Sequence, residues 1–136
     1  MNVALSAANS FATVDYSADV VRLFKQACHA GSLAGIEHAV CGQAGMRAKG
    51  ASVRLWLQFR DDRVQTARFE AYGCPHFLAA AEALCDWAEH RTRTELETWN
   101  WSEVAAYLAM PPAKRARLLV LEDALRHAAG VVGQNR

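Results

Sequence analysis

Alternating apolar and polar positions mark a β-hairpin in the middle of the chain. From Ser52 to Arg60, every second side chain is apolar and the intervening ones point the other way. This period of two predicts a strand with one face on a core. Asp61-Asp62 supplies a turn signal, and residues 64–72 are predicted to return as the second strand.

Helical spacing precedes the hairpin. Ser17 can cap a first helix that runs to about Ala30, in which Val20, Phe24 and Cys28 form an apolar stripe. Cys28 is therefore predicted to lie in the core. The stretch from 31 to 51 holds five glycines and is predicted to be a long loop, with a short helical turn at 36–40 as an alternative.

Further helices follow the hairpin. They are predicted over 77–89, over 102–108 with Ser102 as the cap, and over 112–129 with Pro112 at the start. Cys85 lies on the apolar face of the first of these and should be buried and inert. This order of elements predicts an α+β fold, with helices packed on one face of a small antiparallel sheet. We expect one domain over 16–130, a flexible N-terminal arm over 1–15 and a tail over 131–136.

Composition removes several classes of function. The chain has 136 residues, 52% of them hydrophobic and 21% charged, and a net charge of +1, which gives no argument for nucleic acid as a partner. No apolar stretch approaches the roughly 20 residues that cross a bilayer, so we expect no membrane association. The four cysteines form no Cys-x-x-Cys pair, as in a reduced cytoplasmic protein. No triad, phosphate loop or carboxylate pair is evident, and we expect no enzyme.

Gly73-Cys74-Pro75-His76 is the most informative motif. It stands where the second strand of the hairpin leads into a helix, and proline suits the first position of that helix. Free N–H groups and the positive end of the helix dipole favour a thiolate at Cys74. The motif thus indicates a reactive or metal-binding sulfur. The alternative is a small apolar plug at a strand–helix junction.

A zinc site is a rival interpretation of the same cysteine. His38-x-x-Cys41 and Cys74-x-His76 would together offer two nitrogens and two sulfurs, a set that suits tetrahedral zinc. The alternatives are a surface loop position for His38 and a first-turn position for His76.

Three segments carry a family resemblance. Phe69-Glu-Ala-Tyr-Gly-Cys74, Met110-Pro-Pro-Ala-Lys114 and Leu121-Glu-Asp-Ala-Leu125 resemble the iron–sulfur cluster assembly scaffolds of the IscU or NifU N-terminal type, over about 16–129. The resemblance implies an IscU/SufE-like α+β sandwich. It implies a cysteine desulfurase as partner. It also implies that a dedicated chaperone docks on the segment formed by Met110, Pro111, Pro112, Ala113 and Lys114.

The chain departs from the family at the cluster ligands. Cys74 matches the second family cysteine, but a lysine, Lys49, stands at the first. Arg117 stands at the third, and neither the family's aspartate nor its histidine is matched. One cysteine cannot supply the roughly four ligands of a [2Fe–2S] cluster. If Lys49 and Arg117 face Cys74, they disfavour metal cations, favour anions and lower the pKa of the thiol.

These arguments predict a degenerate scaffold relative with a solitary, activated thiol. The preferred hypothesis is a sulfur carrier whose persulfide forms on Cys74, stabilised by Lys49 and Arg117, with no resident cofactor expected. A second hypothesis is a non-catalytic interaction protein that modulates the desulfurase or the chaperone. A third keeps a zinc- or cluster-binding role through Cys41 and Cys74, because Cys41-Gly42-Gln43 faintly matches the family's first cysteine motif.

Overall fold

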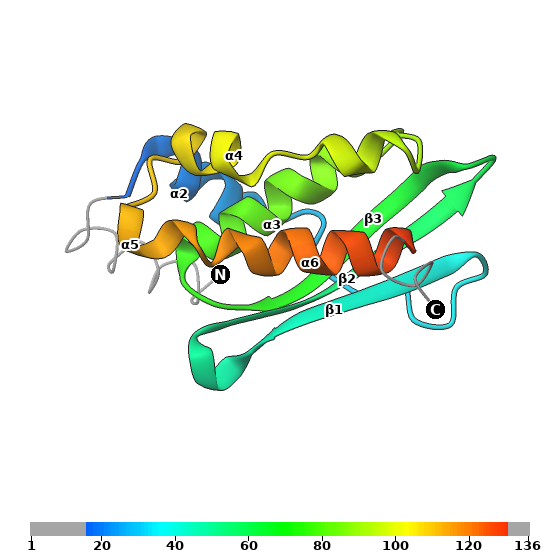
Figure 1. Ribbon diagram of the computed structural model, residues 1–136, viewed down its shortest axis with the longest axis horizontal. Helices are drawn as coiled ribbons and strands as arrows, with labels where there is room; N and C mark the ends of the chain where they lie inside the picture. Colours follow the sequence, from blue (N-terminus) through cyan, green and yellow to red (C-terminus); the bar gives the residue numbers. More distant parts are fainter. Residues whose placement is uncertain (1–15, 131–136) are drawn as a thin grey trace.

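A layer of helices covers one face of a three-stranded antiparallel sheet in the computed structural model, which describes residues 16–130 (Figure 1). The strands are adjacent in chain order, β1-β2-β3. This confirms the predicted α+β class. The elements are α2 (Ala18–Gln26), β1 (Ala39–Met46), the 3₁₀ turn η1 (Arg47–Lys49), β2 (Ala51–Arg60), β3 (Arg63–Tyr72), α3 (Pro75–Ala88), the 3₁₀ turn η2 (Glu95–Thr98), α4 (Trp101–Tyr107), α5 (Pro112–Arg115) and α6 (Leu118–Ala129).

The predicted loop over 31–51 is wrong, because it contains strand β1. β1 pairs antiparallel with β2 from Ala39 opposite Gln58 to Met46 opposite Ala51. The glycines of this stretch led to the loop prediction, because glycine is depleted in strands and typical of loops. Gly42 is required by packing: a Cβ built there would lie 2.1 Å from the carbonyl oxygen of Ala124 in α6.

The first helix begins where the sequence indicates and ends earlier. Ser17 caps α2, and its Oγ accepts a hydrogen bond from the backbone N–H of Val20. The helix ends at Gln26 because Ala27 adopts a left-handed conformation, with φ of 33°. Cys28 therefore lies beyond the helix and is exposed, so its predicted place in the core is wrong.

Two of the later helix predictions also need correction. Asn100, rather than Ser102, caps α4, and its side chain accepts from the N–H groups of Ser102 and Glu103. The predicted continuous helix from 112 to 129 is divided into α5 and α6, which are separated at Ala116 and Arg117. Lys114 therefore lies at the end of α5 and not in the first turns of α6.

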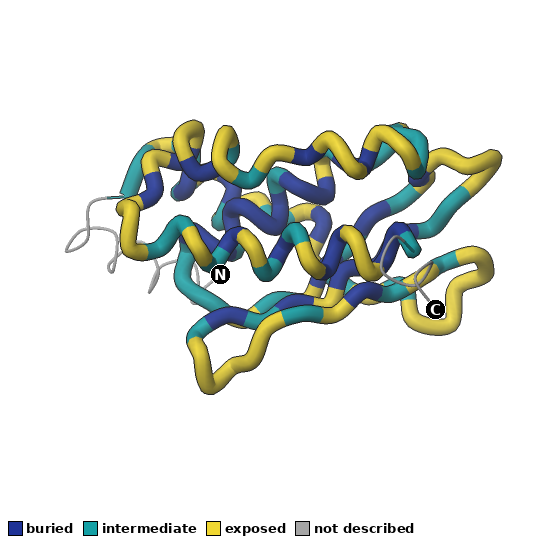
Figure 2. Tube along the Cα trace, in the orientation of Figure 1, coloured by how far each residue is buried: buried dark blue, intermediate teal, exposed yellow. Residues whose placement is uncertain are grey.

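The core lies between the sheet and the helices. α6 packs across β1 and β2, α3 packs on β3, and α2 packs against α3. Figure 2 shows the buried positions along α3 and on the inner side of α6. Cys85 is fully buried, which confirms its prediction. The largest fully buried side chains are Phe77, Leu55, Leu57, Leu84, Leu96, Leu108, Met110, Leu118, Leu121, Leu125, Val20 and Val64.

None of the helices within 16–130 is long and apolar enough to cross a bilayer. The predicted N-terminal arm and C-terminal tail, 1–15 and 131–136, lie outside the described residues.

Candidate functional site

Cys74 is the N-cap residue of α3, as the sequence predicts. It has extended backbone angles, Pro75 follows in the first helical turn, and its carbonyl accepts the N–H of Leu78 at 3.0 Å. Its own side chain makes no capping hydrogen bond. Gly73 is needed because a Cβ there would lie 2.7 Å from the Phe77 ring. The half-buried sulfur is thereby held at the positive end of a 14-residue helix.

Three side chains surround this end of α3. The ring of Tyr16 lies 4.6 Å from the ring of His76, and the Lys114 ammonium lies 6.0 Å from the Tyr16 ring centre. Burial raises the pKa of Tyr16, and the charge of the Cys74 thiolate raises it further. Burial and then Lys114 lower the pKa of His76, so this imidazole is neutral at neutral pH. Cys74 therefore has a phenol, a neutral imidazole and a cation close by.

The two predicted basic residues, Lys49 and Arg117, lie together. Both line a shallow hollow between η1 and the start of α6, which Asp123 also lines. A Cβ at Gly50 would lie 3.3 Å from the Arg117 guanidinium, so Arg117 covers the turn that follows Lys49. Cys74 is not among the described residues that line this hollow.

The sheet register places Lys49 and Cys74 at the same end of the fold. Tyr72 pairs with Ser52, so β3 runs out toward Cys74 beside the turn from which β2 begins. Lys49 itself is exposed and ends η1. Lys49 and Arg117 thus lie at the end of the sheet that leads to Cys74, and the hollow that they line does not include Cys74.

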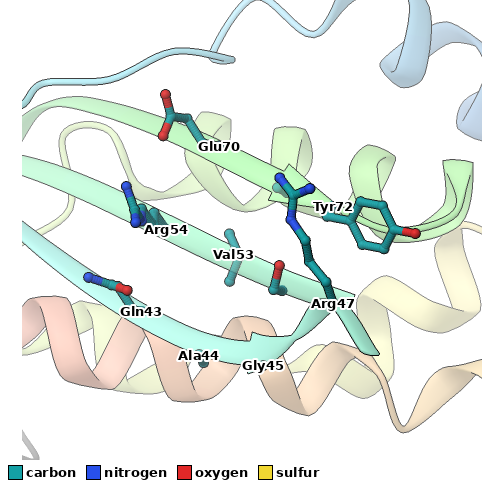
Figure 3. Close-up of a pocket in the computed structure, with 10 residues that line it drawn as sticks. Gln43, Ala44, Gly45, Arg47, Val53, Arg54, Glu70 and Tyr72 are labelled. Carbon is teal, nitrogen blue, oxygen red and sulfur yellow. The ribbon is translucent and has the colours of Figure 1, made fainter. Parts of the chain in front are cut away.

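A polar hollow on the face away from the helices borders the same end. Gln43, Arg54 and Glu70 stand in register on the three strands, and Figure 3 shows their side chains on this face. The guanidinium of Arg47 lies 5.0 Å from the ring centre of Tyr72, two residues before Cys74. Arg47 adds a cation that the sequence analysis did not single out.

The predicted zinc set is wrong because the sheet separates its members. On β2, Cys41 is paired with Trp56, whereas Tyr72, two residues before Cys74, is paired with Ser52. Trp56 and Ser52 are four residues apart, which is roughly 13 Å along the strand at about 3.3 Å per residue. His38 precedes β1 beyond that point, and its side chain is 71% exposed. Ligands of one zinc ion must all lie about 2 Å from it. Neither Cys41 nor His38 therefore joins Cys74 and His76.

The segment Met110–Lys114 divides into a buried anchor, Met110, and an exposed tip formed by Pro111, Pro112 and Ala113. Met110 is 1% exposed and belongs to the core, so its side chain is not available to a partner. Pro111, Pro112 and Ala113 are exposed, and Lys114 is half-buried. The docking surface suggested by the resemblance is reduced to these last four residues.

A cluster formed by Cys28, His29 and Glu82 was not predicted. The Cys28 thiol donates to Glu82 Oε2 at 3.1 Å, and His29 Nδ1 lies 2.6 Å from the same oxygen. Burial alone would lower the pKa of His29, but hydrogen bonds to Glu82 and Glu89 outweigh burial and raise it. A glutamate on the apolar face of α3, among alanines and leucines, was the signal in the sequence.

Comparisons with known proteins agree with this architecture. Residues 15–132 match the family described as the NifU-like N terminal domain. The iron–sulfur cluster assembly scaffold protein IscU of Azotobacter vinelandii is 32% identical over 88 residues, which cover 64% of this chain and 69% of that protein. IscU of Escherichia coli K12 is 26% identical over 115 residues, 83% of this chain and 90% of that protein.

A solved structure supports the fold at lower identity. The crystal structure of a candidate scaffold for the SUF system from Fervidobacterium islandicum AW-1 superposes with a TM-score of 0.68 at 16% identity, covering 84% of this chain and 96% of that one. With a family match that spans all of the described residues and the same α+β architecture, the chain belongs to the NifU-like N-terminal domain family.

Proposed function

We propose that this protein acts in iron–sulfur cluster assembly as a sulfur carrier, with Cys74 as the thiol that accepts sulfur from a cysteine desulfurase. The family and its IscU relatives, which are named for cluster assembly, support the general role. The observation that carries the specific role is the position of Cys74, half-buried at the N-terminus of α3.

The other three cysteines are less suited to nucleophilic chemistry. Burial raises the pKa of Cys85 well above its ordinary value, and it also raises the pKa of Cys41. The hydrogen bond to Glu82 raises the pKa of Cys28, and burial adds to this. Since the thiolate is the reactive form, these environments reduce reactivity at neutral pH. Cys74 instead precedes the first turn of α3, whose N–H groups have no acceptor within the helix itself.

The proposed step is a thiol–persulfide exchange. The Cys74 thiolate attacks the outer sulfur of the persulfide on the desulfurase. A new S–S bond forms at Cys74, the S–S bond on the desulfurase breaks, and the desulfurase cysteine leaves as a thiolate. No external oxidant is needed because the transferred sulfur already carries the required oxidation level.

Nearby cations support the product of this exchange. A persulfide is anionic at neutral pH, and Lys49, Arg117, Arg47 and Lys114 all lie at this end of the fold. A basic end of the fold suits a protein that receives and passes on anionic sulfur species. The same charges would attract the acidic rim of a partner.

The small number of potential metal ligands near Cys74 favours a sulfur-carrier role over a role in which this protein binds its own cluster. A [2Fe–2S] cluster needs about four protein ligands. Among residues 16–130, three potential metal ligands lie within 4.8 Å of one another, and these are Cys28, His29 and Glu82. Cys74 does not belong to this group. Cluster binding at Cys74 would therefore need ligands from a partner.

Mass spectrometry of Cys74 after reaction with a desulfurase and cysteine tests the proposal. We expect a mass gain of one sulfur atom on the Cys74 peptide, lost on reduction and absent in Cys74→Ser. Cys41→Ser, which removes another half-buried thiol, should keep the modification. Persulfide on Cys41 or Cys28 alone, or none in the wild type, would reject Cys74 as the carrier.

A non-catalytic interaction role is the second candidate, and the exposed tip formed by Pro111, Pro112 and Ala113 favours it. In that case the protein would alter desulfurase or chaperone activity without holding sulfur. Cys74→Ser separates the two roles: it should abolish sulfur transfer and leave an interaction role intact.

A further inference from the structure

A second constellation of metal-ligating side chains lies apart from Cys74, at the exit of α2. After Ala27 the chain turns and runs along the outer edge of β3, where Phe69 N–H donates to the His29 carbonyl at 3.0 Å. The N–H of Gly31 donates back to the Phe69 carbonyl at 2.8 Å. Cys28 and His29 are thereby fixed between this edge and Glu82 of α3.

From this geometry we infer that Cys28, His29 and Glu82 form a binding site for a zinc-like divalent cation, independent of the sulfur chemistry at Cys74. The sulfur of Cys28 lies 3.1 Å from Glu82 Oε2 and 3.4 Å from His29 Nδ1. His29 Nδ1 and Glu82 Oε2 are 2.6 Å apart. One sulfur, one nitrogen and one oxygen thus converge on a single point.

These separations are close to those of a tetrahedral zinc site. Metal bonds of about 2.0 Å to N and O and 2.3 Å to S place neighbouring ligands roughly 3.3–3.8 Å apart. The two contacts of the sulfur are already within a few tenths of an ångström of this range. Only the contact between His29 and Glu82 must open, by somewhat less than 1 Å.

The surroundings of His29 supply an independent indication. Its other ring nitrogen, Nε2, lies 3.1 Å from Glu89 Oε1, and Glu89 accepts the N–H of Ala67 at 3.0 Å and contacts Arg68 at 3.3 Å. Metal-binding histidines usually donate their second N–H to a carboxylate in this way, which fixes the ring. The imidazole is therefore held in position with Nδ1 toward the proposed ion.

Burial and charge fit a dication. Glu82 is 3% exposed and His29 is 8% exposed, while Cys28 is exposed, so a water molecule from the solvent could serve as a fourth ligand. Both ring nitrogens of His29 face carboxylates, Nδ1 toward Glu82 and Nε2 toward Glu89. A Cys28 thiolate and the Glu82 carboxylate would together balance the charge of a dication.

The donor set selects the class of metal. A thiolate with an imidazole and a carboxylate suits zinc and cobalt, whereas magnesium and calcium prefer oxygen ligands only. A bound ion would connect the exit of α2 to the middle of α3, 54 residues away in the chain. It would stabilise the folded state by mass action.

Cobalt(II) titration of the metal-free full-length protein tests the site, because a cobalt–thiolate bond gives a charge-transfer absorption band. We expect one equivalent to produce this band and zinc to displace it. Cys28→Ser should remove the band, while Cys41→Ser and Cys74→Ser keep it. Cys28 is exposed, so its replacement should leave the fold, followed by circular dichroism, unchanged.

Glu82→Gln provides the second variant, since it keeps the shape of the side chain and removes its charge. We expect at least a tenfold weaker zinc affinity in competition with cobalt, and no change for Glu122→Gln on α6. A band that survives Cys28→Ser and disappears with Cys74→Ser would place the metal elsewhere. Absence of any band in the wild type would overturn the inference. Neither result would affect the persulfide test of Cys74.

Discussion

The imidazole of His76 packs against the phenol ring of Tyr16, with the ring centroids 4.6 Å apart. His76 is 3% exposed, and its Nδ1 atom has no hydrogen-bond partner among the residues that the structure describes. The first turn of α3, immediately after Cys74, therefore contains a buried histidine that has no acceptor ready for a second proton.

This arrangement predicts a loss of stability in mild acid. Burial and then Lys114 lower the pKa of His76 in the folded state, whereas the unfolded chain takes up this proton near pH 6.5. As the pH falls through about 6.5, this site binds more protons in the unfolded state than in the folded state, so the contribution of His76 to the unfolding free energy must decrease. His76→Phe keeps an aromatic ring in place and removes this contribution.

Urea unfolding from pH 8 to pH 5 measures the effect as the difference between wild type and His76→Phe. We expect the variant to gain stability relative to the wild type as the pH decreases. The exposed His38 is the control, and His38→Gln should follow the wild-type profile. A constant difference between wild type and His76→Phe across this range would contradict the argument.

The absence of a side chain at Gly42 allows α6 to pack closely on β1. A Cβ at this position would lie 2.1 Å from the Ala124 carbonyl oxygen and 2.5 Å from the Ala128 nitrogen, both backbone atoms. Gly42→Ala must push the helix away from the sheet, and overpacking of this kind costs about 3 kcal/mol. Chemical denaturation should show this loss, while Gln43→Ala on the same strand should change stability by less than about 0.5 kcal/mol. A Gly42→Ala protein of wild-type stability would mean that α6 does not approach β1 so closely.

The same glycine explains why β1 escaped sequence analysis. The strand β2 and the position of Cys74 follow from local rules, namely alternation of apolar residues and a proline in the first turn of a helix. In β1 the residue type at Gly42 is set instead by a helix that lies about 80 residues later in the chain. The hydrophobic pattern of residues 39–46 alone contains no information about how closely α6 packs on this strand.

The cluster of Cys28, His29 and Glu82 has the same kind of origin. Spacing placed Cys28 on the apolar stripe of α2, but Ala27 adopts a left-handed conformation and turns the chain out of the helix. Only the packing of α2 against α3 then brings Glu82 to the cysteine. Lys49 and Arg117 line one hollow, and only the family resemblance had connected these two positions, because periodicity carries no long-range information.

Gly50 and Arg117 form a contact that a side chain would disturb. Gly50 has φ of +93°, and a Cβ there would lie 3.3 Å from the guanidinium of Arg117. Gly50→Ala should cost about 1–2 kcal/mol, since it adds a shift of Arg117 to the strain of the left-handed backbone. Gly35→Ala is a matched control, with φ of +80° and open space around the new methyl group, and should cost about 1 kcal/mol.

A double-mutant cycle isolates the contact with Arg117. In an Arg117→Ala background, Gly50→Ala should cost no more than Gly35→Ala, because only the backbone strain is left. Equal costs for the two glycine substitutions in the wild-type background would show that Arg117 does not rest on the turn.

The segment from Met110 to Lys114 should separate stability from partner binding. Met110 is 1% exposed in the core, so Met110→Ala should cost about 2–4 kcal/mol of unfolding free energy. Pro111 and Ala113 are exposed, and substitutions there that leave the backbone intact should change stability by less than about 0.5 kcal/mol. Thermal unfolding of Met110→Ala and Ala113→Asp compares the two positions directly.

We propose that the exposed tip docks the dedicated chaperone that the family resemblance implies, and binding to that chaperone should then give the opposite ranking. Ala113→Asp should weaken the complex, because it places a charge on the exposed tip while the fold is preserved. Met110→Leu, which keeps volume and burial, should bind like the wild type. If Met110→Leu lost binding at unchanged stability and Ala113→Asp did not, the buried anchor would have to become exposed in the complex, and the partition between anchor and tip would be wrong.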